Sequence, residues 1–195
     1  MPRLTLPCSA ALSLALATTA IANTPSGDAW GNSQEDVRAQ AVETPVLDAP
    51  GRLVHHTHYQ DTPVTLNRRF GDDGLWQARY FNRSAHDEPG AFLTDYQRWQ
   101  ARLTEQYGEP ERDVREWRND SLKEQGGMEG MGLAGGHLTL FTAWENDEAM
   151  IVMTLQREHM AMAHQLLFTD PAAAVRPSQT ATGRPERGPT TPPAP

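Results

Sequence analysis

The strongest structural signal in the sequence is a run of aromatic and leucine residues between positions 91 and 107. The apolar side chains recur at steps of four, three, four and four, at Phe92, Tyr96, Trp99, Leu103 and Tyr107. This spacing places them on one stripe of an α-helix, whereas charged residues such as Asp95 and Arg98 fall off the stripe. Gly108 and Pro110 end the helix, because glycine suits a left-handed C-cap and proline cannot continue a helix. The sequence therefore predicts an aromatic-faced helix that packs against a sheet.

The chain begins with the pattern of a secretory signal peptide over residues 1–22. Arg3 supplies a positive charge, residues 4–17 supply a short apolar run, and residues 20–22 form a small-residue cleavage site. A membrane anchor is the competing interpretation. It is disfavoured because proline, serine and threonine interrupt the run and no basic cluster follows it. The pattern predicts a periplasmic or secreted protein whose mature chain starts at Asn23 and contains no transmembrane segment.

The remaining sequence divides into three parts by composition. Residues 23–29 are predicted to be a flexible lead, and residues 30–170 are long enough to form a single α+β domain with a core of its own. From Pro171 onward, seven of the last 25 residues are proline and few can be buried. This composition predicts a disordered Pro-rich tail over residues 171–195.

Charge and cysteine content exclude two classes of partner and one means of stabilisation. The chain has a net charge of −8 and no run of basic residues, so neither nucleic acid nor an anionic membrane is a predicted partner. Cys8 is the only cysteine and is removed with the predicted signal peptide. The mature chain therefore has no disulfide, and burial of apolar surface must hold it together.

Alternating apolar residues predict three strands before the central helix, a strand just after it, and then a hairpin. The predicted strands are residues 52–60, 63–70, 75–82, 111–118, 137–145 and 148–156. One strongly apolar face of the hairpin is formed by Leu138, Leu140, Thr142, Trp144, Ala149, Ile151, Met153 and Leu155. A final segment, residues 159–169, alternates like a strand, although its alanine, methionine and leucine also suit a helix. Of these two interpretations of residues 159–169, the strand is favoured.

The turn between the second and third predicted strands leaves two registers open. A two-residue loop would place Phe70 opposite Leu75, whereas a three-residue loop with Gly74 in the left-handed region would place Phe70 opposite Trp76. The second register is favoured because it gathers one apolar face, namely Val64, Leu66, Phe70, Trp76, Ala78 and Tyr80. Arg68 lies on that face, so its side chain must reach the rim or find a carboxylate partner.

The order of the predicted elements defines a fold class. A short helix is predicted over residues 33–41, since Ser33 and Asp36 resemble a capping box, and the glycine-rich residues 119–136 are predicted to form a long loop. The resulting order is helix, three strands, helix, and three or four strands. It predicts an α+β fold of two layers, in which two helices lie on one face of a mostly antiparallel sheet of about six or seven strands.

Four segments carry a family resemblance. They are WGNSQEDV at 30–37, GLWQARYFN at 74–82, LTEQYGEP at 103–110 and LTLFTAWEN at 138–146. Together they resemble a family of small exported bacterial proteins without assigned function, over about residues 30–168. A weaker, fold-level likeness is to the β-lactamase-inhibitor proteins and small outer-membrane assembly lipoproteins, from which this chain departs in lacking a Gly-x-Pro turn soon after its first helix and a lipidated cysteine. The resemblance implies an exported α+β domain and assigns no catalytic residue.

Two groups of histidine and methionine residues have the composition of metal ligands. His56 and His58 point to one side of a predicted strand, where two imidazoles can hold part of a metal site. Met160, Met162 and His164 share a face if their segment is a strand, and thioethers with an imidazole suit Cu(I). The structural alternatives are a solvent-facing polar strand for the first group and methionine used as core filler for the second.

The sequence contains no recognisable catalytic or cofactor motif. The serines lie in caps or loops without a GxSxG motif, and the glycine-rich segment lacks the GKS/T of a nucleotide site. No cofactor is therefore predicted, and the sequence favours an exported non-catalytic domain that binds a protein or an envelope component. Two alternatives stay open: a periplasmic copper- or zinc-binding protein, and a hydrolase whose site is assembled from residues distant in sequence.

Processing of the predicted signal peptide can be tested directly. N-terminal sequencing or intact-mass measurement of the exported protein should show a chain that starts at Asn23, because the small-residue site ends at Ala22. Recovery of exported protein that still carries Met1 or Cys8 would contradict the predicted signal.

Overall fold

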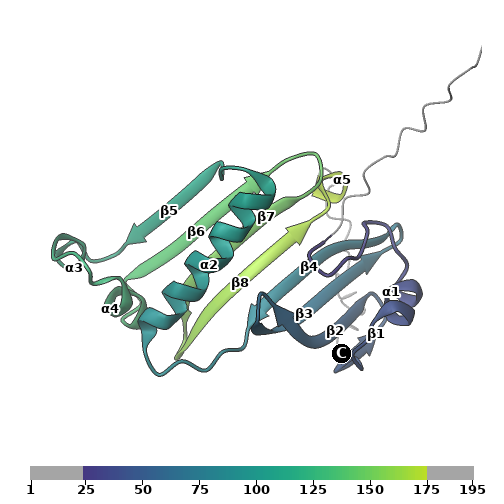
Figure 1. The fold of residues 1–195 in the computed structure, drawn as a ribbon, viewed down its shortest axis with the longest axis horizontal. Coiled ribbons are helices and arrows are strands. Elements are labelled where there is room, and N and C mark those ends of the chain that lie inside the picture. Colours follow the sequence, from purple (N-terminus) through teal and green to yellow (C-terminus); the bar gives the residue numbers. More distant parts are fainter. Residues whose placement is uncertain (1–23, 175–195) are drawn as a thin grey trace, which may run out of the picture.

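The computed structural model describes residues 24–174 as one eight-stranded antiparallel sheet with five helices (Figure 1). The strands lie in the order β1-β2-β3-β4-β8-β7-β6-β5. Their bounds are β1 (Leu47–Ala49), β2 (Arg52–Tyr59), β3 (Thr62–Gly71), β4 (Gly74–Asn82), β5 (Arg112–Trp117), β6 (Leu138–Glu145), β7 (Met150–Glu158) and β8 (Ala161–Thr169). The helices are α1 (Gln34–Gln40), α2 (Pro89–Tyr107), α3 (Asp120–Glu124), α4 (Glu129–Ala134) and α5 (Pro171–Ala174).

The predicted α+β class is confirmed, and the sheet is larger than the six or seven strands expected. The additional strand is β1, a three-residue segment that is too short to show an alternating pattern. α5 occupies the first four residues of the predicted tail. The predicted signal peptide and residues 175–195 of the predicted tail lie outside the described residues.

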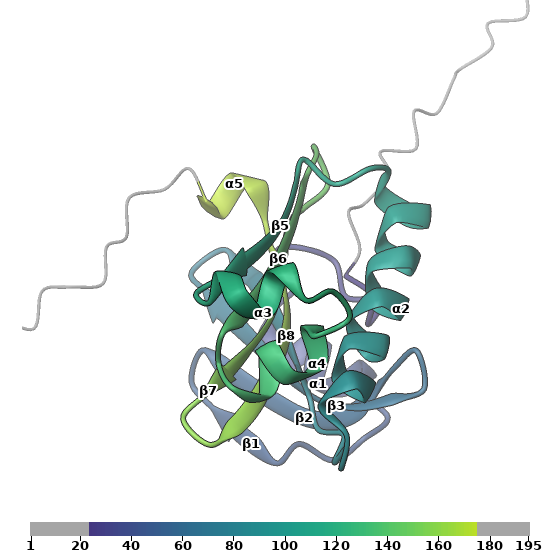
Figure 2. The same ribbon diagram turned by 90° about the vertical axis from the view of Figure 1, so that its left-hand side faces the viewer.

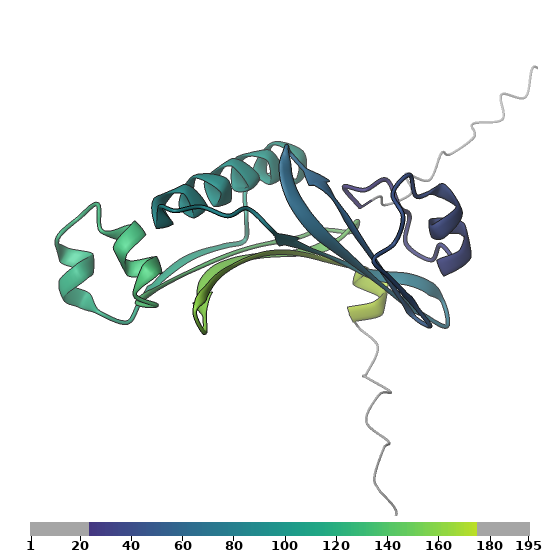
Figure 3. The ribbon, with the colours of Figure 1, turned by 90° about the horizontal axis from the view of Figure 1, so that it is seen from below.

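The last strand joins the two halves of the sheet. β2, β3 and β4 form one antiparallel meander and β5, β6 and β7 form another. β8 pairs with β4 on one side and with β7 on the other. In Figure 3, α1 and α2 lie on one side of the sheet and α5 lies on the other. α2 packs on β7 and β8 while α1 contacts β2, so the two helices cover different halves.

α2 forms where the aromatic stripe predicts it and buries that stripe. Trp99 and Leu103 are fully buried, and Tyr96 is 2% exposed. The Tyr96 hydroxyl lies 2.6 Å from Thr142 Oγ1 on β6, so the burial leaves both oxygens hydrogen-bonded. After the last turn, Gly108 takes a φ of +86°, a conformation that favours glycine.

The hairpin of β3 and β4 contains both of the registers that the sequence leaves open. Leu66 pairs with Tyr80, as the three-residue loop requires, but Phe70 pairs with Leu75, as the two-residue loop requires. A β-bulge immediately before Phe70 joins the two registers. The favoured register is therefore wrong at the tip of the hairpin, where Leu75 is buried in place of Trp76.

Gly74 is required at this turn for two reasons. Its φ is +90°, and a Cβ at this position would lie only 2.2 Å from the carbonyl oxygen of Gly31. Leu75 donates its N–H to the carbonyl of Asn32 at 2.8 Å, and Gly31 donates to the carbonyl of Leu75 at 2.9 Å. These bonds fasten the segment before α1 to the hairpin tip.

The apolar face predicted for the second hairpin is confirmed. All of its predicted side chains are buried, namely Leu138, Leu140, Thr142, Trp144, Ala149, Ile151, Met153 and Leu155. β8 is a strand, as favoured, and its Leu166 and Phe168 extend the same core.

The long loop predicted over residues 119–136 is wrong, because α3 and α4 lie within it. Leu133 on α4 is fully buried. Gly132 lies so close to Trp117 that a Cβ would come within 2.6 Å of the indole ring. The glycines that suggest flexibility in the sequence here permit a helix to pack closely against an aromatic side chain.

Trp99 at the centre of this packing gives a stability test. Trp99→Ala should lower the free energy of unfolding by about 3–5 kcal/mol, because the whole side chain is buried. Gln97→Ala, on the exposed side of the same helix, should change it by less than about 0.5 kcal/mol. Urea unfolding of both variants measures the difference, and equal stabilities would show that the stripe is not the core.

Candidate functional site

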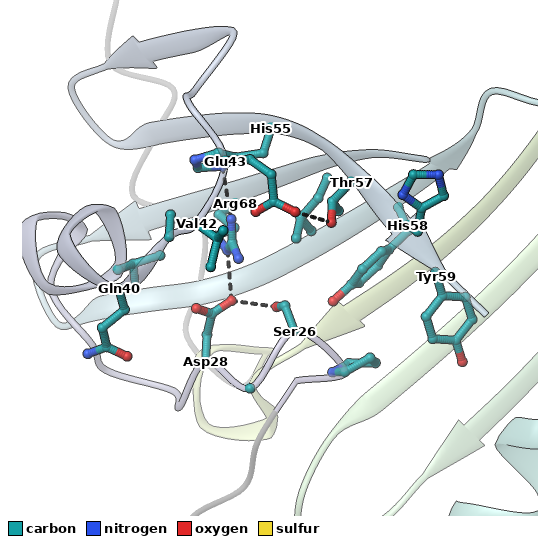
Figure 4. A pocket seen from close by; sticks show the side chains of 16 residues that line it. Ser26, Asp28, Gln40, Val42, Glu43, His55, Thr57, His58, Tyr59 and Arg68 are labelled. Atoms are coloured by element: carbon teal, nitrogen blue, oxygen red, sulfur yellow. Dashed lines mark hydrogen bonds and ion pairs between the residues drawn. The ribbon is translucent and has the colours of Figure 1, made fainter. Parts of the chain in front are cut away.

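A pocket of about 270 Å³ opens between the N-terminal segment, the connector after α1, and β2, β3 and β4 (Figure 4). We refer to it as the His55 pocket. Its polar lining includes Asp28, Glu43, His55, Arg68 and Tyr80, and its apolar lining includes Val37 and Leu66.

The N-terminal segment reaches the pocket as a hydrogen-bonded turn, in place of the flexible lead predicted over residues 23–29. Thr24 donates its backbone N–H to the carbonyl oxygen of Asp28 at 2.8 Å. Gly27, with a φ of +82°, permits the reversal of the chain. Ser26 Oγ donates to Asp28 Oδ2 at 2.5 Å. The turn holds the Asp28 carboxylate over β3.

Arg68 and Asp28 form a buried ion pair in the pocket. Arg68 Nε lies 2.7 Å from Asp28 Oδ2, and each side chain is 8% exposed. Arg68 follows Val64 and Leu66 on the inner face of β3, so its side chain points into the interior. Of the two predicted alternatives for Arg68, reaching the rim or finding a carboxylate partner, the structure shows the second. Removing either partner would leave a buried charge unpaired, at a cost of about 3–5 kcal/mol.

His55 is neutral, and the structure determines which of its nitrogens carries the proton. Arg68 Nη1 lies 3.0 Å from His55 Nδ1. Because a guanidinium can only donate, Nδ1 accepts this bond and Nε2 carries the hydrogen. Burial, and then the positive charge of Arg68, lower the pKa of His55. The Nε2–H group has no hydrogen-bond partner among the described residues.

Tyr80 contributes a second donor without a partner. Its hydroxyl is buried and makes no hydrogen bond of normal geometry within residues 24–174, although Ser26 lies near enough to act on its pKa. Burial raises the pKa of Tyr80 to about 12, so the hydroxyl keeps its proton at physiological pH. At the exposed rim, Glu43 accepts from Thr57 Oγ1 at 2.8 Å, and this bond lowers the pKa of Glu43. The pocket thus combines unused donors inside with a carboxylate at its rim.

The structure does not bring the two predicted groups of metal ligands together. His56 and His58 are exposed on β2, while Met162 and His164 lie on β8, and β3 and β4 lie between these two strands. Met160 is 86% exposed in the turn before β8, and His164 is buried. In the part of the chain that the structure describes, no three residues of the types His, Cys, Asp and Glu are placed to share a metal ion.

His164 instead belongs to a hydrogen-bonded network under α2. Asn82 Nδ2 donates to Asp95 Oδ2 at 3.0 Å and to His164 Nδ1 at 3.1 Å. His86 Nε2 and Arg98 Nη2 each lie 2.7 Å from the Asp95 carboxylate. Burial acts to raise the pKa of Asp95, but the hydrogen bonds from His86 and Asn82 outweigh it and lower the pKa. Although Asp95 falls off the aromatic stripe, it is therefore buried and ionised.

Sequence reasoning groups His55 with His56 and His58 as candidate site residues, but it does not identify His55 or Tyr80 as hydrogen-bond donors of a pocket. His55 adjoins His56 on β2, but successive side chains of a strand point to opposite faces, and His55 is the one that faces the interior. The available signal is Arg68, because a charged side chain on an apolar face requires a partner from elsewhere in the chain. Its partner could not be named, since residues 23–29 show no regular pattern.

The comparisons with known proteins leave the family resemblance as a prediction, since no family model, curated protein or solved structure matches this chain. Among residues 24–174, none of the helices has the length and apolar character needed to cross a membrane.

His164 predicts a pH dependence of stability. Burial lowers its folded pKa to about 3, below the ordinary value of 6.5, so between these values the unfolded chain binds a proton that the folded chain does not. Stability should therefore fall as the pH drops below 6.5, by about 1.4 kcal/mol per pH unit from this group. His164→Leu should reduce the slope between about pH 6.5 and 5 by that amount in urea unfolding.

Met162→Leu is the matched control for this experiment, because it changes a neighbouring side chain of β8 without removing a titrating group. It should keep the wild-type slope. An unchanged slope in His164→Leu would show that the imidazole is accessible to protons in the folded state.

Proposed function

We propose that this chain is an exported, non-catalytic binding domain, and that it holds an uncharged polar group of a protein or envelope component in the His55 pocket. The observation that carries the proposal concerns two residues that line the pocket, His55 and Tyr80. The His55 Nε2–H and the Tyr80 hydroxyl are buried and have no hydrogen-bond partner among the described residues. A buried polar group left unsatisfied costs about 1–3 kcal/mol. An oxygen atom of a ligand that accepts from these donors would recover that cost. Export is proposed from the sequence pattern of residues 1–22.

The protonation state of His55 supports binding over catalysis. A histidine that acts as a general base must offer the lone pair of one nitrogen to its substrate. In this pocket the lone pair of Nδ1 accepts from Arg68, and Nε2 already carries a hydrogen. His55 therefore serves as a fixed donor. The Asp28 carboxylate is likewise engaged within the protein, because it accepts hydrogen bonds from Arg68 and Ser26.

The charges around the pocket favour an uncharged ligand. The positive charge of Arg68 is balanced by Asp28 at 2.7 Å, and Glu43 adds a negative charge at the rim. An anion would gain little from Arg68 and would be repelled by Glu43. An amide or hydroxyl group fits better, because its oxygen can accept from His55 and Tyr80 while a hydrogen it carries can bond to a carboxylate. The pocket volume of about 270 Å³ suits one such group and its neighbours.

Tyr80→Phe tests the proposal, because it removes one donor and changes little else. Since the hydroxyl makes no hydrogen bond of normal geometry within residues 24–174, the variant should be as stable as wild type, or more stable by about 1 kcal/mol. The same variant should lose most of the material that the immobilised wild-type chain retains from a cell-envelope extract. Urea unfolding and quantitative mass spectrometry of the retained material give the two measurements.

Tyr107→Phe is the control, since the Tyr107 hydroxyl bonds to Gln106 and does not line the pocket. This variant should retain the same material as wild type. If Tyr80→Phe also retains it, or if the wild-type chain retains nothing above an empty matrix, the proposed role of the pocket is wrong.

A further inference from the structure

β5 is the longer of the two strands at the edges of the sheet, and its outer edge is open. It ends the strand order next to β6, and Figures 1 and 2 show no described element along its other side. β1, at the opposite edge, has three residues against six in β5. An edge of this length presents backbone donors and acceptors that can pair with another strand.

The hydrogen bonds to β6 determine which backbone groups of β5 point outward. Arg118, just after the strand, donates its N–H to the carbonyl of His137 beside β6 at 2.8 Å. In an antiparallel pair the backbone groups of every second residue point to the same neighbour. Those of Val114 and Glu116 therefore point to β6, and those of Asp113 and Arg115 point away from the sheet.

The side chains of β5 divide between the two faces of the sheet. Asp113 Oδ1 accepts from Thr142 Oγ1 at 3.2 Å, and Arg115 lies 3.9 Å from Glu129 on α4, so both lie on the face that α2 covers. Arg112 and Glu116 then lie on the opposite face, on either side of Val114. Val114 is 38% exposed although it is apolar.

This order of residues is self-complementary, and we propose that two copies of the chain pair through β5 in an antiparallel dimer centred on Val114. Centring on Val114 places Arg112 opposite Glu116 of the second copy and Asp113 opposite Arg115 of the second copy. By symmetry each of these oppositely charged pairs forms twice. The pairs of Arg112 with Glu116 lie on one face of the joined sheet, and those of Asp113 with Arg115 lie on the other. The two Val114 side chains meet at the axis, and the outward backbone groups of Asp113 and Arg115 bond to each other.

Neighbouring registers are disfavoured by charge. Centring the pair on Asp113 would place two aspartates side by side, and centring it on Arg115 would do the same for two arginines. If the axis fell between two residues of β5, the outward backbone groups of one copy would face backbone groups of the other copy that already bond to β6. The charges thus admit one register of self-pairing, while they discourage pairing with unrelated strands.

A disulfide at the axis tests the register. In this dimer the two Val114 residues form a pair without backbone hydrogen bonds, with Cα atoms about 4.5 Å apart, within the span of a disulfide. Val114→Cys in a Cys8→Ser background should therefore form a covalent dimer with oxidised glutathione, in near-complete yield at micromolar concentration. Non-reducing electrophoresis measures the yield.

Arg112→Cys in the same background is the matched control. It lies on the same face of β5, but the two copies of residue 112 would be about 14 Å apart along the strands, four residues at 3.4 Å each. This variant should stay monomeric on the gel. Cross-linking of both variants to the same extent, or of neither, would overturn the proposed register.

Charge reversal tests the pairing without a covalent bond. Sedimentation of the wild-type chain should show a dimer at micromolar concentration, and Arg112→Glu should raise the dissociation constant at least about tenfold, because it creates two like-charged pairs. Adding Glu116→Arg to Arg112→Glu should restore the wild-type constant. A wild-type chain that sediments as a monomer, or a double variant no better than the single one, would overturn the dimer.

Discussion

The buried ion pair between Arg68 and Asp28 is the interaction on which the N-terminal half of the protein depends. α2 packs mainly on β7 and β8 and contacts the first meander near the β2–β3 turn, where Trp99 meets Tyr59. The rest of the inner face of β2, β3 and β4 needs another cover. That cover consists of the turn at residues 24–28, α1 and the connector after it. Because a buried arginine without a carboxylate costs several kcal/mol, the pair holds the turn in place. The His55 pocket exists because this cover leaves space beneath it.

An unpartnered buried atom is informative only together with its surroundings. His164 Nε2 lacks a partner just as His55 Nε2 does, within the described residues. The His164 ring packs against Trp99, with ring centroids 4.1 Å apart, and lines no part of the His55 pocket. The unpaired Nε2 of His164 therefore reflects the free-energy cost of packing a polar ring in the core. His55 and Tyr80 differ because both residues line the His55 pocket.

The parts of the fold that were predictable are those that a single periodic pattern determines. The stripe through Trp99 and Leu103 and the face through Ile151 and Met153 each repeat regularly, and burial follows directly from the repeat. The bulge before Phe70 was not predictable, because it changes the alternation after only a few residues. α4 was missed because its glycines are also typical of loops, and only the position of Trp117 explains them. The His55 pocket depends on contacts between residues 24–28 and β3, far apart in sequence, which no local pattern encodes.

The central position of β8 has a consequence for how the protein is made. Its residues, Ala161–Thr169, follow the other seven strands in the chain, yet they connect β4 to β7. Until they emerge, the two meanders have no strand to join them, and the unpaired backbone groups at the edges of β4 and β7 stay open to wrong pairing. Folding to the complete sheet must therefore wait until all eight strands have been synthesised.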